Sequence, residues 1–206
     1  MIPDFDKMTI KHKVRERNIG IYRKLSGLQS LPKDKQYWTL CATQSRNPKS
    51  EIEQMTSLGF IEKYQFHGVD RDEEIIKQNR KNHTEAHWYA GEWESFINPK
   101  IFNPAFVYLD TTAFADFRVA TNLLVTTMLG CPEYTLLLVN VMLNDPRSRK
   151  SFSLQNLIES LNKELPASFL KKWNNHNHNK LEIDTYDYTA TSRTVMGTCI
   201  FFRNGN

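Results

Sequence analysis

The stretch QFHGVDRDEEIIKQNRKNHTEAHWYAGEW, residues 65–93, decides the fold class of this chain. A short apolar run ends in HGVD, a charged segment follows, and a second short run ends in GEW. This order is typical of a β–α–β unit, in which a helix joins two parallel strands. An acidic residue at the carboxyl end of such a strand can accept hydrogen bonds from both hydroxyls of a ribose. Asp70 is therefore a candidate nucleoside ligand. Alternatively, it decorates a helix N-terminus, where carboxylates are favoured.

The same alternation of strands and helices extends along the chain. Apolar runs at 37–43, 105–110 and 134–143 predict three further buried strands, of which the first is expected to be central. Helices are expected from about residue 48 to 59, around 114–128 and over 153–164. Strands that alternate with helices form a parallel sheet covered on both faces. Two last runs, 181–188 and 195–203, are joined by a short connection and predict an antiparallel C-terminal hairpin.

Length and composition suit one globular domain. The 206 residues are 40% hydrophobic, which is enough for a full core. No apolar run approaches the roughly 20 residues that span a bilayer, and the N-terminus is charged where a signal peptide is apolar. We therefore expect a soluble, cytoplasmic protein without a membrane partner. The three cysteines, at positions 41, 131 and 199, are scattered and are expected to be buried free thiols.

Positive charge is concentrated near the N-terminus. Residues 1–36 hold nine Lys or Arg against four Asp or Glu, whereas the whole chain has a net charge of +4. We expect a basic helical segment over 1–36, interrupted near Gly20, ahead of an α/β domain over 37–206. Lysine and arginine contacts to phosphates supply most sequence-independent affinity for nucleic acid, so DNA or RNA is the predicted partner. The alternative is a solvated basic helix that covers the sheet.

A mostly parallel seven-stranded sheet with a reversed last strand resembles the Rossmann-like, class I S-adenosylmethionine-dependent methyltransferases. The resemblance covers residues 37–203 and implies a three-layer α/β sandwich. In that family an acidic residue at the end of the second strand binds the ribose of the cofactor. Asp70 matches this position, and Arg71 beside it is included in the expected cofactor site. The third strand commonly ends in Gly-Asp, whose carboxylate meets the adenine amine. The GEW sequence is similar, with Glu92 for the amine and Trp93 as a flat face for the purine.

The resemblance also assigns the turn after the first strand. In the family this turn is rich in glycine and lets the backbone approach the methionine part of S-adenosylmethionine. The corresponding stretch here is LCATQS, which holds no glycine. A Cβ at each position restricts positive φ values. The cofactor residues expected in this turn are Cys41, Ala42, Thr43 and Gln44.

The fourth predicted strand ends in LDTTA, residues 109–113. Enzymes of this family that methylate amines of DNA or RNA bases carry an Asn or Asp here, followed by Pro-Pro and an aromatic residue, and hold the target amine with it. Only the acid is present, as Asp110. We expect Asp110 to be the catalytic residue that orients or deprotonates the acceptor. Alternatively, Asp110 is the N-cap of the helix expected to follow.

A second basic group follows the fifth predicted strand. The loop NDPRSRK carries Arg147, Arg149 and Lys150. These residues would flank the substrate side of the same edge, where a phosphate backbone can run. The alternative is an ordinary exposed loop. The tract at 173–179, WNNHNHN, has two histidines without acidic or thiol partners, so it predicts a loop and no metal site.

These observations lead to two hypotheses of different class. The first is an S-adenosylmethionine-dependent methyltransferase that acts on nucleic acid. The second is a non-catalytic module that binds nucleic acid or protein on the same scaffold. A methyltransferase of small molecules is a third possibility.

Overall fold

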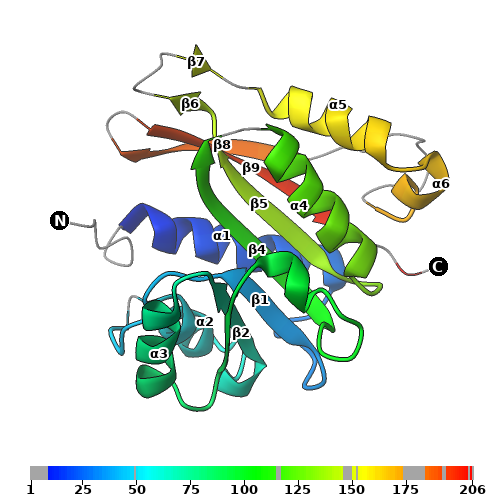
Figure 1. The fold of residues 1–206 in the computed structure, drawn as a ribbon. Coiled ribbons are helices and arrows are strands. Elements are labelled where there is room, and N and C mark those ends of the chain that lie inside the picture. The colour runs from blue at the N-terminus through cyan, green and yellow to red at the C-terminus, as the bar shows by residue number, and fades with distance from the viewer. Residues whose placement is uncertain are drawn as a thin grey trace.

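The computed structural model describes residues 9–48, 50–114, 117–145, 150–151, 153–173, 184–191, 194–203 and 205. Seven strands form one sheet in the order β3-β2-β1-β4-β5-β9-β8 (Figure 1). The first five strands along the chain are parallel, and β9 is antiparallel to both β5 and β8. The expected sheet, including its seven strands and its C-terminal hairpin, is confirmed. Its strands are β1 Gln36–Leu40, β2 Phe66–Asp70, β3 His87–Ala90, β4 Pro104–Phe114, β5 Leu136–Met142, β8 Asp184–Thr191 and β9 Thr194–Phe202.

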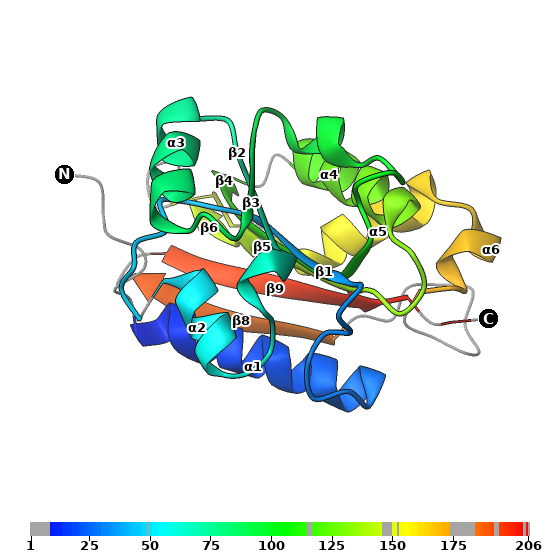
Figure 2. The same cartoon turned by 90° about the horizontal axis from the view of Figure 1, so that it is seen from below.

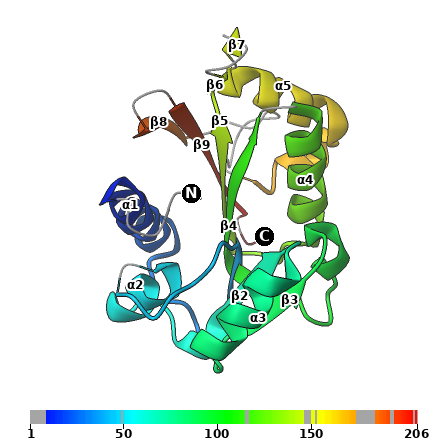
Figure 3. The ribbon, with the colours of Figure 1, turned by 60° about the vertical axis from the view of Figure 1, so that its left-hand side comes forward.

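Helices cover both faces of the sheet, which makes the expected three layers. One face carries α1 Thr9–Ser26, α2 Glu51–Ser57 and α3 Glu73–Asn82, and the other carries α4 Phe117–Gly130, α5 Leu154–Glu164 and α6 Ala167–Leu170. Figures 2 and 3 show α1 and α2 on the side of the sheet away from α4 and α5. The short helix η3 Trp93–Phe96 connects β3 to β4, and η2 Lys63–Gln65 precedes β2. A separate hairpin of β6 Asn144–Asp145 and β7 Lys150–Ser151 follows β5.

The sequence of β5 explains how one sheet builds two cores. Successive side chains of a strand point to opposite faces. Leu136 and Leu138 therefore lie in the core under α1 and α2, whereas Leu137 and Val139 lie in the core under α4 and α5. All four are fully buried. An uninterrupted apolar run is what a strand buried on both faces requires.

Helix α1 is continuous, which corrects the expected interruption at Gly20. A single glycine inside a helix costs only about 1 kcal/mol relative to alanine. The helix offsets this cost by packing Val14, Ile19 and Tyr22 into the core beside strand residues of β1 and β4. The basic N-terminal segment thus has a buried apolar side as well as a charged one.

Two strand boundaries at the carboxyl edge differ from the sequence-based expectation, and β8 also ends at Thr191 instead of residue 188, while residues 181–183 lie outside the described residues. β1 ends at Leu40 instead of residue 43, while β4 continues to Phe114 instead of ending at Asp110. β4 continues because it pairs with β5 as far as Phe114 opposite Met142, across an irregularity after Asp110. In Figure 1 the green β4 accordingly extends well beyond the end of β1. β4 also takes the central place in the sheet, with β1 beside it.

The three cysteines are buried and free, as predicted. Among the described residues, no helix combines the length and the apolar character that crossing a membrane requires.

Candidate functional site

The sheet has a topological switch point between β1 and β4, where the order in which the strands are added changes direction. From β1 the chain proceeds outward to β2 and β3 on one side, and then continues with β4 and β5 on the other. In open α/β sheets ligands bind outside the carboxyl ends of the strands at such a switch point. Asp70 and the turn after β1 lie at this edge, and Asp110 lies on β4 beside it.

Asp70 is the last residue of β2, as predicted. Its Oδ1 accepts a hydrogen bond from the backbone N–H of Asp72 at 2.8 Å. Asp72, in turn, is the N-cap of α3 and accepts from the N–H groups of Glu74 and Ile75. Asp72 therefore caps the helix, while Asp70 stays at the strand end. Burial raises the pKa of Asp70, and the side chain is only partly buried.

The end of β3 lies against the end of β2. Gly91 has a φ of 141°, a backbone conformation that residues other than glycine rarely adopt. Its N–H donates to the backbone oxygen of Asp70 at 2.9 Å. Beyond it, Glu92 forms an ion pair with Arg71, with Nη2 and Oε2 2.7 Å apart. The structure thus brings Asp70, Arg71 and Glu92 together. The ion pair is exposed, and such pairs contribute only about 0–1 kcal/mol, so it can open for a ligand.

Trp93 does not present the ring face that the sequence suggested. Its side chain is 3% exposed and lies in the core under α4. Its Nε1 donates to Thr127 of α4 at 2.8 Å, and its ring meets that of Trp38 edge-on. Because the short helix η3 begins at Trp93, the ring turns inward instead of toward the strand ends. The prediction that Trp93 stacks on a purine is therefore wrong for this conformation.

The turn after β1 is filled by a side chain of the turn itself. Gln44 is 1% exposed, and its Oε1 accepts from the N–H groups of Glu51 at 3.0 Å and Ile52 at 3.4 Å. These are the first two residues of α2, and helix N-termini leave such groups without intrahelical partners. Gln44 therefore caps α2. The side chain assigned to the cofactor is used internally, which corrects the prediction for Gln44.

Helix α3 fastens the same turn. Asn79 accepts from the N–H of Gln44 at 2.6 Å and donates to the backbone oxygen of Ala42 at 3.1 Å. Cys41 points into the core, where burial holds the pKa of its thiol well above its ordinary value. Its predicted contact with a cofactor is therefore not made by the thiol. Of the four predicted residues, Ala42 is exposed and Thr43 is half-buried.

Asp110 lies inside β4, and α4 begins only at Phe117, so Asp110 is not a helix cap. Its Oδ2 is 2.5 Å from Nζ of Lys11 on α1, and each side chain is 14% exposed. Burial alone would raise the pKa of Asp110. The charges of Lys11 and Arg15 and a hydrogen bond from Asn140 outweigh burial and hold the pKa below its ordinary value. Asp110 is thus an ionised carboxylate with an ammonium group against it.

Asp110 is also fixed by a hydrogen-bond network of buried residues that the sequence analysis did not identify. Asn140 of β5 donates from Nδ2 to Asp110 at 3.1 Å and to the hydroxyl of Tyr108 at 2.6 Å. Its Oδ1 accepts from the hydroxyl of Thr198 on β9 at 2.6 Å. Asn140 and Thr198 are fully buried. Asn140 was detectable, because it is the one polar residue in the run LLLVNVM, and buried polar groups need partners.

The predicted substrate loop is largely outside the described residues. Arg147 and Arg149 are not described, and of Lys150 only the backbone, in β7, is described. The histidine tract after Trp173 also lies outside the described residues. The predictions for both segments remain predictions.

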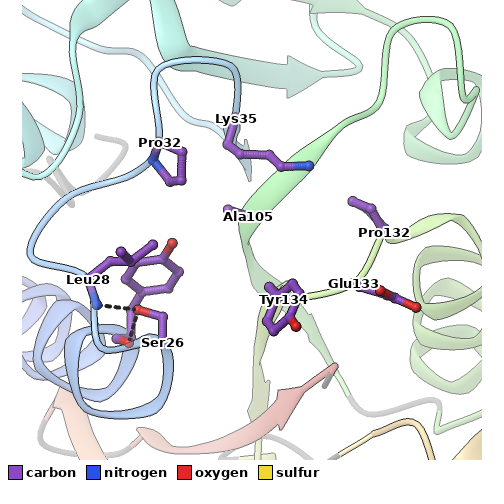
Figure 4. Close-up of a pocket in the computed structure, with 9 residues that line it drawn as sticks. Ser26, Leu28, Pro32, Lys35, Ala105, Pro132, Glu133 and Tyr134 are labelled. Carbon is purple, nitrogen blue, oxygen red and sulfur yellow. Dashed lines mark hydrogen bonds between the residues drawn. The ribbon is translucent and has the colours of Figure 1, made fainter. Parts of the chain in front are cut away.

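A hollow of about 550 Å³ lies at the other edge of the sheet. Figure 4 shows it between the loop that carries Pro32 and Lys35 and the connection that carries Pro132 and Tyr134. The amino-terminal ends of β4 and β5 border it, whereas α/β sheets place their ligand crevice at the carboxyl ends. We therefore do not assign the predicted cofactor site to it. Its lining residues are Tyr22, Ser26, Leu28, Pro32, Lys35, Ala105, Pro132, Glu133 and Tyr134.

No known protein family and no curated protein matches the sequence. Solved structures match the fold. The N-methyltransferase NodS from Bradyrhizobium japonicum has a TM-score of 0.60 at 8% identity, over 97% of this chain and 99% of that chain. A S-adenosylmethionine-dependent methyltransferase from Clostridium acetobutylicum has a TM-score of 0.54 at 9% identity, over 94% and 92% of the two chains.

A third match is to a longer protein. TrmN from Thermus thermophilus has a TM-score of 0.55 at 10% identity over 90% of this chain, which spans 48% of the TrmN chain. Structural matches at identities this low establish a shared fold and nothing beyond it. The chain therefore has the Rossmann-like fold of the S-adenosylmethionine-dependent methyltransferases.

Proposed function

We propose that this protein is an S-adenosylmethionine-dependent methyltransferase that binds its cofactor at the carboxyl edge of β1, β2 and β3. One observation carries the proposal: Asp70 ends β2 beside the switch point of a sheet whose β9 is reversed. A carboxylate at this place can accept from both ribose hydroxyls.

The residues at the edge fit the two halves of the cofactor unequally. Asp70 and Glu92 are at the surface with carboxylate oxygens that suit a ribose and an adenine amine. In the turn that would meet the methionine half, the N–H of Gln44 and the backbone oxygen of Ala42 are bonded to Asn79. When bound, S-adenosylmethionine supplies an electrophilic methyl group on a sulfonium sulfur. Asp110 would orient the acceptor, because its carboxylate is ionised and is fixed by Asn140.

Titration calorimetry with S-adenosylmethionine and with S-adenosylhomocysteine tests the proposal. We expect heat of binding for both ligands. We also expect transfer of a labelled methyl group to DNA, to RNA or to a compound in a metabolite extract. Absence of heat and of any thermal shift at millimolar ligand would reject the enzyme.

We propose further that the substrate is a nucleic acid. The support is a stripe of cations on the exposed side of α1: Lys13, Arg17 and Lys24 are exposed and are spaced by four and seven residues. This spacing places them on one face of a helix. Cations on one exposed face can contact several phosphates of one nucleic acid, and such contacts supply sequence-independent affinity.

The salt dependence of binding tests the substrate. Changing all three cations to glutamine should reduce the log–log salt slope by about 0.9 per lost contact on duplex DNA, or about 0.7 on single strands. The matched control is the triple change of Lys163, Lys171 and Lys172, which are exposed on the other side of the sheet and should leave the slope unchanged. Methyl transfer to DNA, to RNA and to a metabolite extract completes the test. Incorporation only into the extract would identify a small-molecule enzyme.

The filled turn favours a second candidate, a non-catalytic binding module. The Gln44 side chain bonds to the first N–H groups of α2, and Asn79 bonds to two backbone groups of the turn, so a ligand would have to compete for them. A module of this kind would bind nucleic acid or protein through α1 with the same salt dependence. It would show neither cofactor heat nor methyl transfer, so calorimetry separates the two candidates.

A further inference from the structure

The ammonium group of Lys11 lies where an acceptor group would meet Asp110. The contact joins two residues 99 positions apart in the sequence, one on α1 and one on β4. Both side chains are 14% exposed, so the pair is largely buried but still reaches the surface. A ligand can therefore reach this position from solvent.

The carboxylate would keep its orientation without Lys11. Its second oxygen is bonded to Asn140, which in turn bonds to Tyr108 and Thr198. These partners come from three neighbouring strands and are almost completely buried. Removal of the lysine side chain would therefore leave a formed site for a cation or another N–H donor.

Helix α1 is also anchored without Lys11. Val14, Ile19 and Tyr22 are in the core. Arg15 forms an ion pair with Glu51 of α2 at 3.4 Å. Lysine is a compact charge on a flexible four-carbon stem. The side chain of Lys11 can therefore swing away while the helix stays in place.

We propose that Lys11 is a built-in occupant of the acceptor position, and that the substrate binds by displacing it with an amine nitrogen of its own. The inference rests on the proposed function, because it takes Asp110 as the acceptor end of the site. On transfer, the nitrogen lone pair forms the bond to the methyl carbon as the carbon–sulfur bond breaks. The sulfur keeps that electron pair, and the proton of the amine leaves to water.

Chemical rescue in the absence of cofactor tests the occupant. Lys11→Ala removes three carbons and the ammonium group, which n-propylammonium replaces atom for atom. We expect Lys11→Ala to unfold at a lower temperature and n-propylammonium to restore most of the loss, while n-propanol restores none. Lys11→Ser, which also leaves the position of the ammonium group empty, gives a second variant that should also be stabilised by n-propylammonium.

The matched control is another ion pair of this chain. Lys63 pairs with Glu53 at 2.7 Å, with side chains 30% and 24% exposed. Lys63→Ala should gain no more from n-propylammonium than wild type does, and wild type should gain much less than Lys11→Ala. Equal responses in all variants, or no response in either Lys11 variant, would show that the Lys11 contact is an ordinary ion pair and would overturn the inference.

Transfer of labelled methyl groups links the position to the reaction. If Lys11 occupies the position about nine-tenths of the time, its removal should improve the apparent affinity for an amine acceptor about tenfold. The acceptors compared are n-propylamine and the nucleosides adenosine and cytidine, which distinguish an aliphatic amine from the amine of a base. Rescue without improved transfer to any of them would overturn the acceptor assignment. Failure of the enzyme proposal is seen separately, as the absence of cofactor binding to wild type.

Discussion

Asp70 and Asp110 hold similar places in the sequence but have different surroundings in the structure. Each follows an apolar residue in a buried strand next to β1. Asp70 is only partly buried, bonds to a neighbouring backbone N–H, and has a raised pKa because it is partly desolvated. Asp110 is paired with Lys11 and Asn140 and has a lowered pKa.

A sequence pattern therefore predicts that an acidic residue lies at a strand end. The pKa and the hydrogen bonds of its carboxylate depend also on residues that are distant in the sequence. The partners of Asp70 come from the two residues that follow it. Those of Asp110 come from α1 and β5, 99 and 30 residues away in the sequence. We accordingly propose that Asp70 binds the cofactor, and that Asp110 is a fixed, charged carboxylate which the substrate contacts.

The largest expected effect is on stability. Asp110→Ala takes the carboxylate away from Lys11 and Asn140, and breaking a largely buried ion pair costs about 3 kcal/mol. Asp70→Ala removes a hydrogen bond at the surface and should cost about 1 kcal/mol. Urea unfolding of the two variants measures both values. Equal losses would show that the two sites are not different in the way described.

Affinity for the cofactor product should show the reverse order. Asp70→Ala should weaken binding of S-adenosylhomocysteine by about 1.5–3 kcal/mol, the range for hydrogen bonds to a charged group. Asp110→Ala should leave it nearly unchanged, because Asp110 is assigned to the acceptor. Calorimetry on the folded variants gives both numbers. A greater loss of affinity in Asp110→Ala than in Asp70→Ala would show that the ribose does not bind at the end of β2.

The filled turn after β1 provides a smaller effect. Gln44→Ala removes the cap of α2 and should cost about 1 kcal/mol of stability, the usual value for a lost N-cap. Because the N–H of Gln44 and the backbone oxygen of Ala42 already bond to Asn79, wild type should bind S-adenosylhomocysteine and adenosine with affinities that differ by less than about tenfold, or 1.4 kcal/mol. A much larger preference for S-adenosylhomocysteine would mean that the turn rearranges to hold the methionine part.

The acid dependence of stability should have opposite signs at the two sites. The pKa of Asp110 is lowered on folding, so its contribution is present above the unfolded pKa and is lost as the pH falls through the folded pKa. The pKa of Asp70 is raised, so protonation on folding relieves a cost as the pH falls. Compared with wild type, Asp110→Asn should lose less stability between pH 5 and 2, and Asp70→Asn should lose more. Urea titrations across this range show whether the two changes differ in sign.

The sheet was predictable because each strand carries its own pattern. The run LLLVNVM and the alternating C-terminal runs specify buried strands and a hairpin by local periodicity alone. The position of Asp70 at the end of β2 was predictable for the same reason. The end of β4 was not, because its continuation to Phe114 depends on pairing with Met142 of another strand.

Side-chain roles at the site were less predictable for a physical reason. Trp93 looked like an exposed ring after a strand, but its indole donates to Thr127, which is 34 residues away. Gln44 looked like part of a cofactor turn, but its amide caps a helix seven residues later. Such contacts depend on how helices cross the sheet, which periodicity does not encode.

A structure of the protein with S-adenosylhomocysteine bound would test the proposed cofactor site most directly. We predict the ribose hydroxyls on the carboxylate of Asp70 and the sulfur directed toward the Asp110 end of the edge, with the pair of Arg71 and Glu92 opened by the adenine. A ligand seated in the hollow beside Tyr134, or elsewhere than at the carboxyl ends of β1 and β2, would contradict it.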